Sequence, residues 1–478
     1  MQEGGRARVD RSKKRKRKSK KFLVYFPPYA IINLCTAAPA VLNVPGLLFY
    51  NLKAGVFFLS SFLLFFKRLG RAIANAFGAD RINPEFKKFT LMHEVYILAT
   101  VVTPTFVNTL LMRVSGTEDI ALYYNFVHYI FIALSMLIAA KLLHHVTRKT
   151  VILIGVALSM VVYVIVLTCM DFVDSVYAVV AAVHGIATGL YWITYSDALL
   201  QYSTDDTRDI CINFVGIFSG MISLFLPLLS GYLLDLFTDL TGYYILFGAC
   251  GAMALLAVWL VTRLESEEID HKKTQFMLVM KKVYTEKMWF FAIHMDFFRG
   301  IRDGAFSFFL NVLLFSIVSS EALVGVNTFL AGAVSMIASG IAGRIARPHN
   351  RMRLMTAAVA LLLGVTALLF WQLNPFTVLL LSAASSFVGV FINNPVTTTL
   401  YTVFDHFPDS LAYKREVLSV SECYKDLGRI SGIALIMLMP SGVIWSIVSL
   451  CILVSLQFVT VLFARLTLRT VRKNCPGQ

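Results

Sequence analysis

Two apolar segments of the sequence, 287–316 and 415–438, contain ionisable residues at helical spacing. Four of these residues are acidic and four are basic, and most recur every three or four positions. At about 100° per residue, such positions share one face of a helix. The charged set consists of Asp296, Arg299, Arg302, Asp303, Glu422, Lys425, Asp426 and Arg429. Asn311 continues the face of the first segment, and the set as a whole carries no net charge.

Charges inside apolar segments limit where the charged set can lie. Each ionised side chain at the centre of a bilayer costs about 2.5–3.5 kcal/mol, so eight that faced lipid would cost on the order of 20 kcal/mol. The set must therefore face protein or water. One interpretation is structural, with ion pairs between the two helices holding them together. The other is a site for a solute and a proton, in which Asp303, the deepest acid, titrates and Arg299 or Arg302 binds an anionic group. Both hold if protonation breaks an ion pair.

The segments that position these residues have the composition of membrane helices. The chain has 478 residues, of which 58% are hydrophobic and only 15% are charged, against roughly 25% charged in typical soluble domains. Its mean hydropathy is +0.72. Apolar blocks of about 18–25 residues match a hydrocarbon core of roughly 30 Å. We predict an all-α integral membrane protein with twelve spans, at residues 91–111, 120–140, 150–170, 175–199, 209–234, 242–263, 287–316, 322–342, 353–373, 377–402, 415–438 and 442–465.

Basic residues gather in alternate connections between the predicted spans. Lys141, Arg148 and Lys149 follow the second span. The other basic connections are 263–287, 344–353, 414–415 and 465–473. This distribution follows the positive-inside rule and predicts a multi-pass protein of the cytoplasmic membrane with cytoplasmic N- and C-termini. The net charge of +15 is therefore interpreted as a signal of orientation, and no nucleic-acid partner is expected.

The twelve predicted spans divide into two similar halves. Residues 106–111 align with 309–314 at an offset of 203, and the same offset maps Glu118 onto Glu321. Two six-span halves of this kind are typical of parallel-repeat transporters. The predicted domains are a basic cytoplasmic tail (1–22), a hydrophobic hairpin or re-entrant segment (23–68), an interfacial amphipathic segment (69–90), an N-terminal six-helix bundle (91–263), a cytoplasmic inter-bundle loop (264–286), a C-terminal six-helix bundle (287–470) and a cytoplasmic tail (471–478).

The first 90 residues do not belong to the repeat. Residues 11–21 form a basic run, which we interpret as an anchor on anionic lipid at the inner face of the membrane. The apolar stretch 22–66 is interrupted near residues 43–46 and has basic clusters at both ends. Because both clusters favour the cytoplasm, a helical hairpin or a re-entrant pair is favoured over a single crossing. The alternative is a start codon assigned too far upstream, which would make this segment incidental.

Polar and aromatic residues mark the spans that are expected to line a central cavity. The third, sixth, ninth and twelfth predicted spans have essentially no ionisable residues in their interiors, which indicates that they are peripheral. Stripes of hydroxyl, amide, imidazole and aromatic side chains lie in the others, and such a lining suits sugars, aromatic rings or lipid headgroups. The alternative is ordinary helix packing. The predicted cavity-lining residues are Asn108, Asn125, His128, His184, Tyr191, Trp192, Tyr195, Asn394, Thr398 and Tyr401.

The sequence shows no constellation for covalent or metal chemistry. The seven cysteines are scattered, without a CxxC pair or a Cys/His cluster. The ATP-binding motif G-x-x-x-x-G-K-[ST] is missing from the sequence. We therefore expect a protein that is not an enzyme, without catalytic residues, metal site or cofactor.

The chain resembles the major facilitator superfamily over residues 91–470. That family has a loop signature, roughly G-x-L-A-D-R-x-G-R-K, after its second span, and here residues 140–149 read AKLLHHVTRK, with His144 in place of the Asp. The corresponding loop of the second half reads GRIARPHNR at 343–351. The resemblance implies gating roles for Arg148, Lys149, Gly343, Arg347 and Arg351. The glycines and proline of the fifth span, Gly220, Pro227 and Gly231, resemble the antiporter motif of the family, which favours export.

Within this superfamily, three segments resemble a poorly characterised group of bacterial permeases, the YqgE-like group. They are YWITY at 191–195, RDGAFSFFLNVLLF at 302–315 and DLGR at 426–429. The leading hypothesis is a secondary transporter that moves a small solute across the cytoplasmic membrane by alternating access, coupled to protons. The alternatives are a flippase of a lipid-linked substrate and a membrane receptor or scaffold without transport. The expected partners are membrane lipid, protons and a small-molecule or lipid-linked substrate.

Overall fold

The computed structural model describes residues 83–202, 208–266, 276–347, 349–405, 414–440 and 442–474. Within these ranges the regular secondary structure is helical. The predicted basic tail, the predicted hydrophobic hairpin and most of the predicted interfacial segment lie outside the described residues.

The helices follow the order that the apolar blocks predict. The first half contains α3 (Pro84–Thr100), α4 (Thr103–Ser115), α5 (Asp119–Leu142), α6 (Arg148–Thr168), α7 (Tyr177–Tyr202), α8 (Arg208–Asp235) and α9 (Thr241–Thr262). The second half contains α11 (Lys287–Phe306), α12 (Phe309–Val318), α13 (Glu321–Ile345), α14 (Arg351–Ala367), α15 (Pro375–Asp405), α16 (Lys414–Met437), α17 (Val443–Ser455) and α18 (Gln457–Asn474). A short helix, α10 (Phe276–Thr285), lies within the predicted inter-bundle loop.

The described helices make twelve spans. Eleven are long and apolar enough to cross a membrane, and three of these combine two consecutive helices: α3 with α4, α11 with α12, and α17 with α18. The twelfth span is α16, which has the length of its neighbours and contains half of the charged set. It packs between α5 and α11, and among its charged residues Asp426 is fully buried. This arrangement confirms the predicted twelve-span, all-helical fold.

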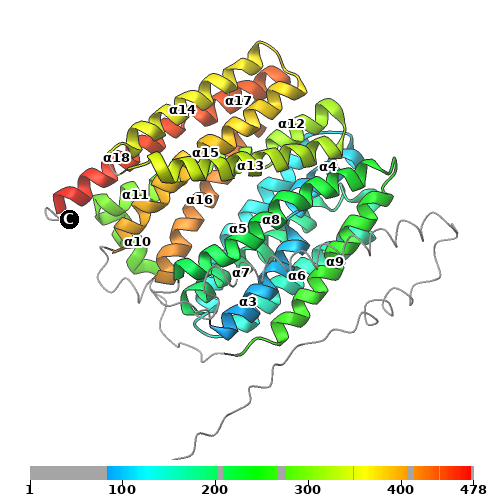
Figure 1. The fold of residues 1–478 in the computed structure, drawn as a ribbon, viewed down its shortest axis with the longest axis horizontal. Coiled ribbons are helices and arrows are strands. Elements are labelled where there is room, and N and C mark those ends of the chain that lie inside the picture. The colour runs from blue at the N-terminus through cyan, green and yellow to red at the C-terminus, as the bar shows by residue number, and fades with distance from the viewer. Residues whose placement is uncertain are drawn as a thin grey trace, which may run out of the picture. The chain divides into compact units, whose positions relative to one another are not determined.

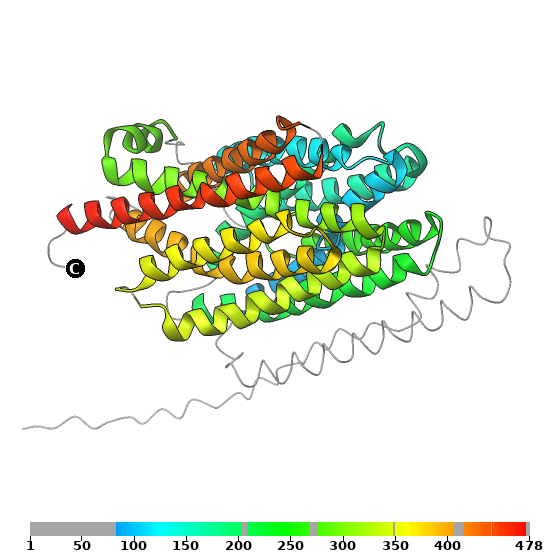
Figure 2. The ribbon, with the colours of Figure 1, turned by 90° about the horizontal axis from the view of Figure 1, so that it is seen from above.

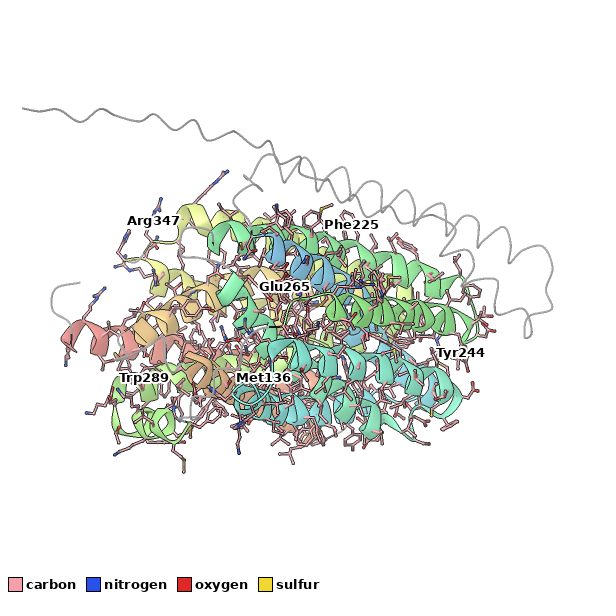
Figure 3. The ribbon with its side chains drawn as sticks, turned by 90° about the horizontal axis from the view of Figure 1, so that it is seen from below. Met136, Phe225, Tyr244, Glu265, Trp289 and Arg347 are labelled. Carbon is pink, nitrogen blue, oxygen red and sulfur yellow. The ribbon has the colours of Figure 1, made fainter. Side chains whose placement is uncertain are left out.

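The two ends of the helix bundle differ in charge. Figure 3 shows Arg347, after α13, at one end and Tyr244, near the start of α9, at the other. We call the end with Arg347 the basic end, because the α5–α6 connection, the C-terminal part of α18 and the start of α16 also lie there. The end with Tyr244 is the opposite end. Figure 2 shows that the helices of both halves run in nearly the same direction between these ends.

The first span of each half is broken at mid-length. Thr100 ends α3 and Thr103 begins α4, where Pro104 removes a backbone donor, while Phe306 ends α11 and Phe309 begins α12. One turn after each break, an asparagine bonds to an asparagine of the next span. Asn125 donates to Asn108 at 2.8 Å in the first half, and Asn327 donates to Asn311 at 2.7 Å in the second. The pair Asn108 and Asn311 is the one that the sequence repeat aligns.

The halves meet through two helix pairs. Helix α8 packs against α13, and α5 packs against α16 (Figure 1). At the first pair the backbones approach closely, since a Cβ on Gly231 would collide with the carbonyl oxygen of Glu321, and one on Gly325 would meet that of Pro227 at 2.6 Å. By contrast, nothing lies within 4 Å of a Cβ built on Gly220. Small residues at the α8–α13 contact thus allow the halves to pack tightly.

Candidate functional site

The charged set lies on two adjacent helices of the second half. Asp296 and Asp426 are buried, and the side chains of Arg299 and Arg302 are less than a tenth exposed. The side chain of Asp303 is 21% exposed, so it is the more accessible acid of α11. The structure therefore brings together all eight residues that the sequence analysis grouped.

Each of the four ion pairs in the charged set joins residues of one helix. Arg302 bonds to Asp303 at 2.5 Å, and Asp296 pairs with Arg299 one turn further on. On α16, Arg429 bonds to Asp426 at 2.6 Å, and Glu422 pairs with Lys425. The four closest pairings are thus intrahelical, although the structural interpretation of the sequence placed them between helices.

Glycines hold α11 and α16 together. A Cβ on Gly300 would collide with the carbonyl oxygen of Lys425, and one on Gly304 would meet the Cα of Arg429 at 2.5 Å. On the facing helix, Cβ atoms on Gly428 and Gly432 would collide with the carbonyl oxygens of Phe297 and Ile301. We call Gly300, Gly304, Gly428 and Gly432 the glycine seam. Small residues four positions apart on both helices are typical of close helix pairs in membranes.

Two hydrogen bonds tie the charged set to neighbouring helices. Ser421 of α16 donates to Asp296 of α11 at 2.7 Å, and Arg299 donates to Thr397 of α15 at 3.3 Å. Tyr401, one turn beyond Thr397, interacts electrostatically with Glu422 and Arg299. Helices α11, α15 and α16 therefore surround the site from three sides within the second half.

The first half reaches the charged set through Tyr129 of α5. The guanidinium of Arg429 lies over the Tyr129 ring, 5.2 Å from its centre, and the Tyr129 and Ser307 hydroxyls are 3.0 Å apart. A cation over an aromatic face is stabilised by the ring quadrupole, by roughly 0.5–2 kcal/mol depending on burial. This contact joins the halves near mid-membrane.

Aromatic and histidine side chains cluster in the first half. His184 of α7 bonds to Tyr124 of α5 at 2.7 Å and lies 4.3 Å from the ring of His128. His93 of α3 bonds to Tyr191 of α7 at 2.6 Å. These two His–Tyr pairs tie α7 to α5 and to α3.

The predicted cavity-lining residues fall into two groups by exposure. Trp192, Asn394, Thr398 and Tyr401 are exposed, and Tyr195 is partly exposed. The others, Asn108, Asn125, His128, His184 and Tyr191, are buried. Asn125 bonds to Asn108, His184 to Tyr124 and Tyr191 to His93, whereas Nδ1 of His128 has no hydrogen-bond partner within the part of the chain that the structure describes.

The sequence analysis did not include Glu94. Helix α3 begins at Pro84, seven residues before the predicted span, so Glu94 lies in the third turn of the helix instead of at its margin. Asn83 and Pro84 place this start, since the Asn83 side chain accepts a hydrogen bond from the Glu85 amide and Pro84 occupies the first helical position. This N-terminal signal was available in the sequence.

The predicted gating loop of the first half makes contacts within and between halves. Arg148 bonds to Asp197 at 2.9 Å, and Lys149 donates to the carbonyl oxygen of Leu264 at 2.7 Å. His144, which stands where the family signature has Asp, lies 3.5 Å from Glu416 of α16, and both side chains are buried.

The corresponding loop of the second half borders a small cavity. Gly343 and Arg351 line it together with Asn394 and Thr398, and its volume is about 190 Å³. The backbone N–H of Arg347 donates to the Asn350 side chain at 2.7 Å, which shapes the turn before α14.

At the opposite end, Glu321 connects the halves. Arg113 of α4 bonds to Glu321 of α13 at 2.7 Å, and Tyr243 of α9 donates to it at 2.8 Å. Asp235 at the end of α8 accepts hydrogen bonds from the Glu321 amide at 2.9 Å and from the Ser320 hydroxyl at 2.8 Å. A carboxylate is stabilised at such a helix N-terminus by the helix dipole.

A cavity of about 900 Å³ lies beside this contact. It is lined from the first half by Arg113, Glu118 and Asp119, and from the second half by Phe315 and other residues of α12 and the α16–α17 connection. Burial raises the pKa of the Glu118 carboxyl, and the neighbouring Asp119 raises it further.

Replacing Glu321 by glutamine is expected to loosen the contact at the opposite end. A hydrogen bond to a charged group contributes about 1.5–3 kcal/mol, so losing the ion pair should shift the balance between closed and open states roughly tenfold or more. Spin labels at Thr117 and Ile317, measured by double electron–electron resonance, should give a longer or broader distance distribution. The control is Asp239→Asn, whose side chain bonds to Thr241 in its own loop. Unchanged distances in Glu321→Gln would contradict this prediction.

These features define a class of protein: two six-helix halves, a buried charged site, and contacts between the halves near both ends. The profile of the Major Facilitator Superfamily matches residues 89–433. The chain belongs to this superfamily.

Relatives and solved structures agree with this assignment. The chain is 26% identical over 344 residues to a Bacillus subtilis protein described as "Uncharacterized protein YqgE", which covers 71% of this chain and 79% of the relative. A Geobacillus stearothermophilus protein is 25% identical over 171 residues, 36% of this chain and 79% of the relative.

Two solved transporters share the fold. A bacterial homologue of the iron transporter ferroportin, in an inward-facing state, gives a TM-score of 0.61 at 13% identity, covering 81% of this chain and 98% of that one. The nucleoside transporter NupG gives 0.58 at 11% identity, covering 81% and 100%. At these identities the similarity is one of fold.

Proposed function

We propose that the protein is a secondary transporter that carries a small solute across the cytoplasmic membrane by alternating access, coupled to protons. The observation that supports this most directly is that all four ion pairs of the charged set lie within the second half, on α11 and α16. Arg113 with Glu321, and His144 with Glu416, join the halves instead. The halves can therefore part at either end without breaking a pair of the charged set, which would cost about 3–5 kcal/mol.

Polar atoms in the charged set support a binding role. The Nε atoms of Arg299 and Arg429, Nη1 of Arg302 and Oδ2 of Asp426 are buried, and they have no hydrogen-bond partner within the part of the chain that the structure describes. Buried polar groups are nearly always hydrogen-bonded. A solute with ionised or strongly polar groups would supply these partners, and we propose Arg302 with Asp303 as the pair that receives it.

Direction and orientation are part of the same proposal. The basic end carries the loops that the positive-inside rule assigns to the cytoplasm, so the N-terminal start and the C-terminal end of the twelve-span region would both be cytoplasmic. Export is favoured by the resemblance of the fifth span to the antiporter motif, in which Gly231 provides the close contact with α13.

A flippase of a lipid-linked substrate is a second candidate, and one feature favours it. An apolar groove of about 590 Å³ lies between α5 and α16, the helices of opposite halves that pack together. Leu137 and Ile138 of α5, Phe276 and Met280 of α10, and Leu427 of α16 line it. A lipid tail would fit this groove while its headgroup reached the charged set.

The test is transport in liposomes. A thermal-shift screen of purified protein against metabolites and glycolipids identifies a ligand, and its movement is then measured under an imposed pH gradient. Asp303→Asn is expected to reduce gradient-driven transport to background with folding intact, because the amide retains an acceptor for Arg302 but cannot ionise. Asp239→Asn is the control.

The outcomes separate the candidates. Movement only of lipid-linked ligands would favour the flippase. A receptor or scaffold would move no ligand, and neutralising Asp303 and Arg302 together would leave its cellular function unchanged.

A further inference from the structure

Glu94 differs in its partners from the acids of the charged set and from Asp197 and Glu321. Its carboxylate accepts from the hydroxyl of Ser219 on α8, at 2.9 Å and 3.0 Å from its two oxygens. Within the described ranges, no lysine or arginine lies within ion-pair distance of it. The acids of the charged set each pair with a base, as do Asp197 and Glu321. Among these acids, Glu94 is therefore the one whose negative charge is least compensated by the protein.

Because of its position, Glu94 is destabilised in its ionised state when no cation is near, but not in its protonated state. It lies in the third turn of α3, partly exposed, between the buried Val95 and the exposed Leu91. An ionised carboxylate inside a membrane span loses hydration that only a cation or several donors can replace. A neutral carboxylic acid has no such cost. A serine hydroxyl suits both states, since it can donate to a carboxylate and accept from a protonated acid.

Among the described residues, the groups that face Glu94 include no permanently charged cation that could compensate its negative charge. On α3, His93 is adjacent in sequence and bonds to Tyr191. From α7, Tyr191 and Tyr195 interact with Glu94 electrostatically. Both are phenols, and a nearby carboxylate disfavours their ionisation. From α8, Ser219 is the hydrogen-bond partner.

The same region is accessible to small species. Gly216 and Gly220 flank Ser219 on α8, and nothing lies within 4 Å of a Cβ built on either. Trp192, 39% exposed, packs edge-on against Tyr195. The partly exposed Glu94 carboxyl, with an exposed aromatic in the same region, gives a proton carrier such as water a way to reach it.

We propose that Glu94 is the site at which the protein takes up and releases the transported proton, while Arg302 and Asp303 receive the solute. This inference rests on the proposed proton coupling. In the uptake step, a carboxylate oxygen of Glu94 accepts a proton from hydronium, leaving water, and the Ser219 hydroxyl turns from donor to acceptor. In the release step the same O–H bond breaks and the proton returns to water on the other side. The first half then binds the proton at Glu94, and the second half binds the solute at Arg302 and Asp303.

The test is infrared spectroscopy of the purified protein in lipid nanodiscs during a pH titration, with the proton as the only ligand. Above about pH 6, where exposed carboxyls are already ionised, the wild type should still show a protonated-carboxyl C=O band that declines as the pH rises further. Glu94→Gln should lose this band, and Asp303→Asn should keep it. Ser219→Ala should shift its frequency, because a hydrogen bond to the carboxyl is removed. Size-exclusion profiles establish that each variant is folded.

Two results would overturn the proposal: a titrating band that persists in Glu94→Gln, or a wild type without one. If Glu94→Gln were unfolded, the frequency shift in Ser219→Ala would decide, and an unshifted band would count against Glu94. The titration needs no solute. A protein that moves no solute, yet loses the band in Glu94→Gln, would refute the proposed transport and keep the proton site.

Discussion

Replacing Gly432 by valine is expected to prevent α11 and α16 from packing and to abolish production of monodisperse protein. A Cβ at this position collides with the carbonyl oxygen of Ile301, a backbone atom that cannot rotate away. Overpacking that flexible side chains absorb typically costs 1–3 kcal/mol, so a collision with backbone should cost on the order of 3 kcal/mol or more. The glycine seam also positions the charged residues of α11 relative to those of α16, so the substitution would displace the ion pairs as well.

The measurement is the yield, size-exclusion profile and thermal midpoint of the purified variant. Gly364→Val is the matched control, because Gly364 lies within α14 and nothing is within 4 Å of a Cβ built on it. Gly432→Ala should be intermediate. If Gly432→Val and Gly364→Val behaved alike, the close approach of α11 and α16 would not be a requirement of the fold.

Replacing Asp426 by alanine is expected to destabilise the protein by about 3–5 kcal/mol, the cost of leaving a buried ion without its partner. Asp426 is fully buried and bonds to Arg429, whose side chain is 24% exposed. Removing both charges in Asp426→Ala/Arg429→Met should recover much of the loss, since no uncompensated ion remains. Unfolding in denaturing detergent, compared across the cycle of single and double variants, measures this coupling.

An exposed pair with the same spacing supplies the control. Glu85 and Lys88 on α3 are also three residues apart and 2.5 Å from each other, but the Lys88 side chain is 51% exposed. Exposed pairs typically contribute 0.2–1 kcal/mol, so Glu85→Ala should have a small effect. Equal losses in Glu85→Ala and Asp426→Ala would show that burial does not set the energy of the charged set.

Much of the architecture could be predicted from the sequence because membranes impose a length and a polarity on each span. The twelve spans, their order and the grouping of the charged set on α11 and α16 follow from apolar length and helical spacing. Even the asparagine repeat was visible, since Asn108 and Asn311 align at the offset of the two halves. The structure adds that each of them bonds to the following span.

Partners within the site could not be predicted in the same way. Spacing places Asp426 and Arg429 on one face, but it does not decide whether each pairs along its own helix or across to α11. That choice depends on the distance between the helices, which the glycine seam fixes. The residues Gly300, Gly304, Gly428 and Gly432 show the G-x-x-x-G spacing in the sequence, yet only the fold brings the two motifs face to face.

Glu94 was missed for a different reason. Hydropathy alone starts the first span at residue 91, which makes an acid three residues later look like a boundary residue. The capping signal at Asn83 and Pro84 moves the start of the helix outward by two turns and the acid inward by the same amount. Helix-start signals therefore matter for function when a span contains one ionisable residue near its predicted edge.

The position of Asp235 has a consequence for how the chain is made. This carboxylate, on the last residue of α8, covers the amides that begin α13, a helix that starts 86 residues later and belongs to the other half. Since synthesis proceeds from the N-terminus, the ribosome has delivered Asp235 before Glu321 and Ala322 emerge. The later helix thus enters a membrane in which the acceptor for its first amides is already present.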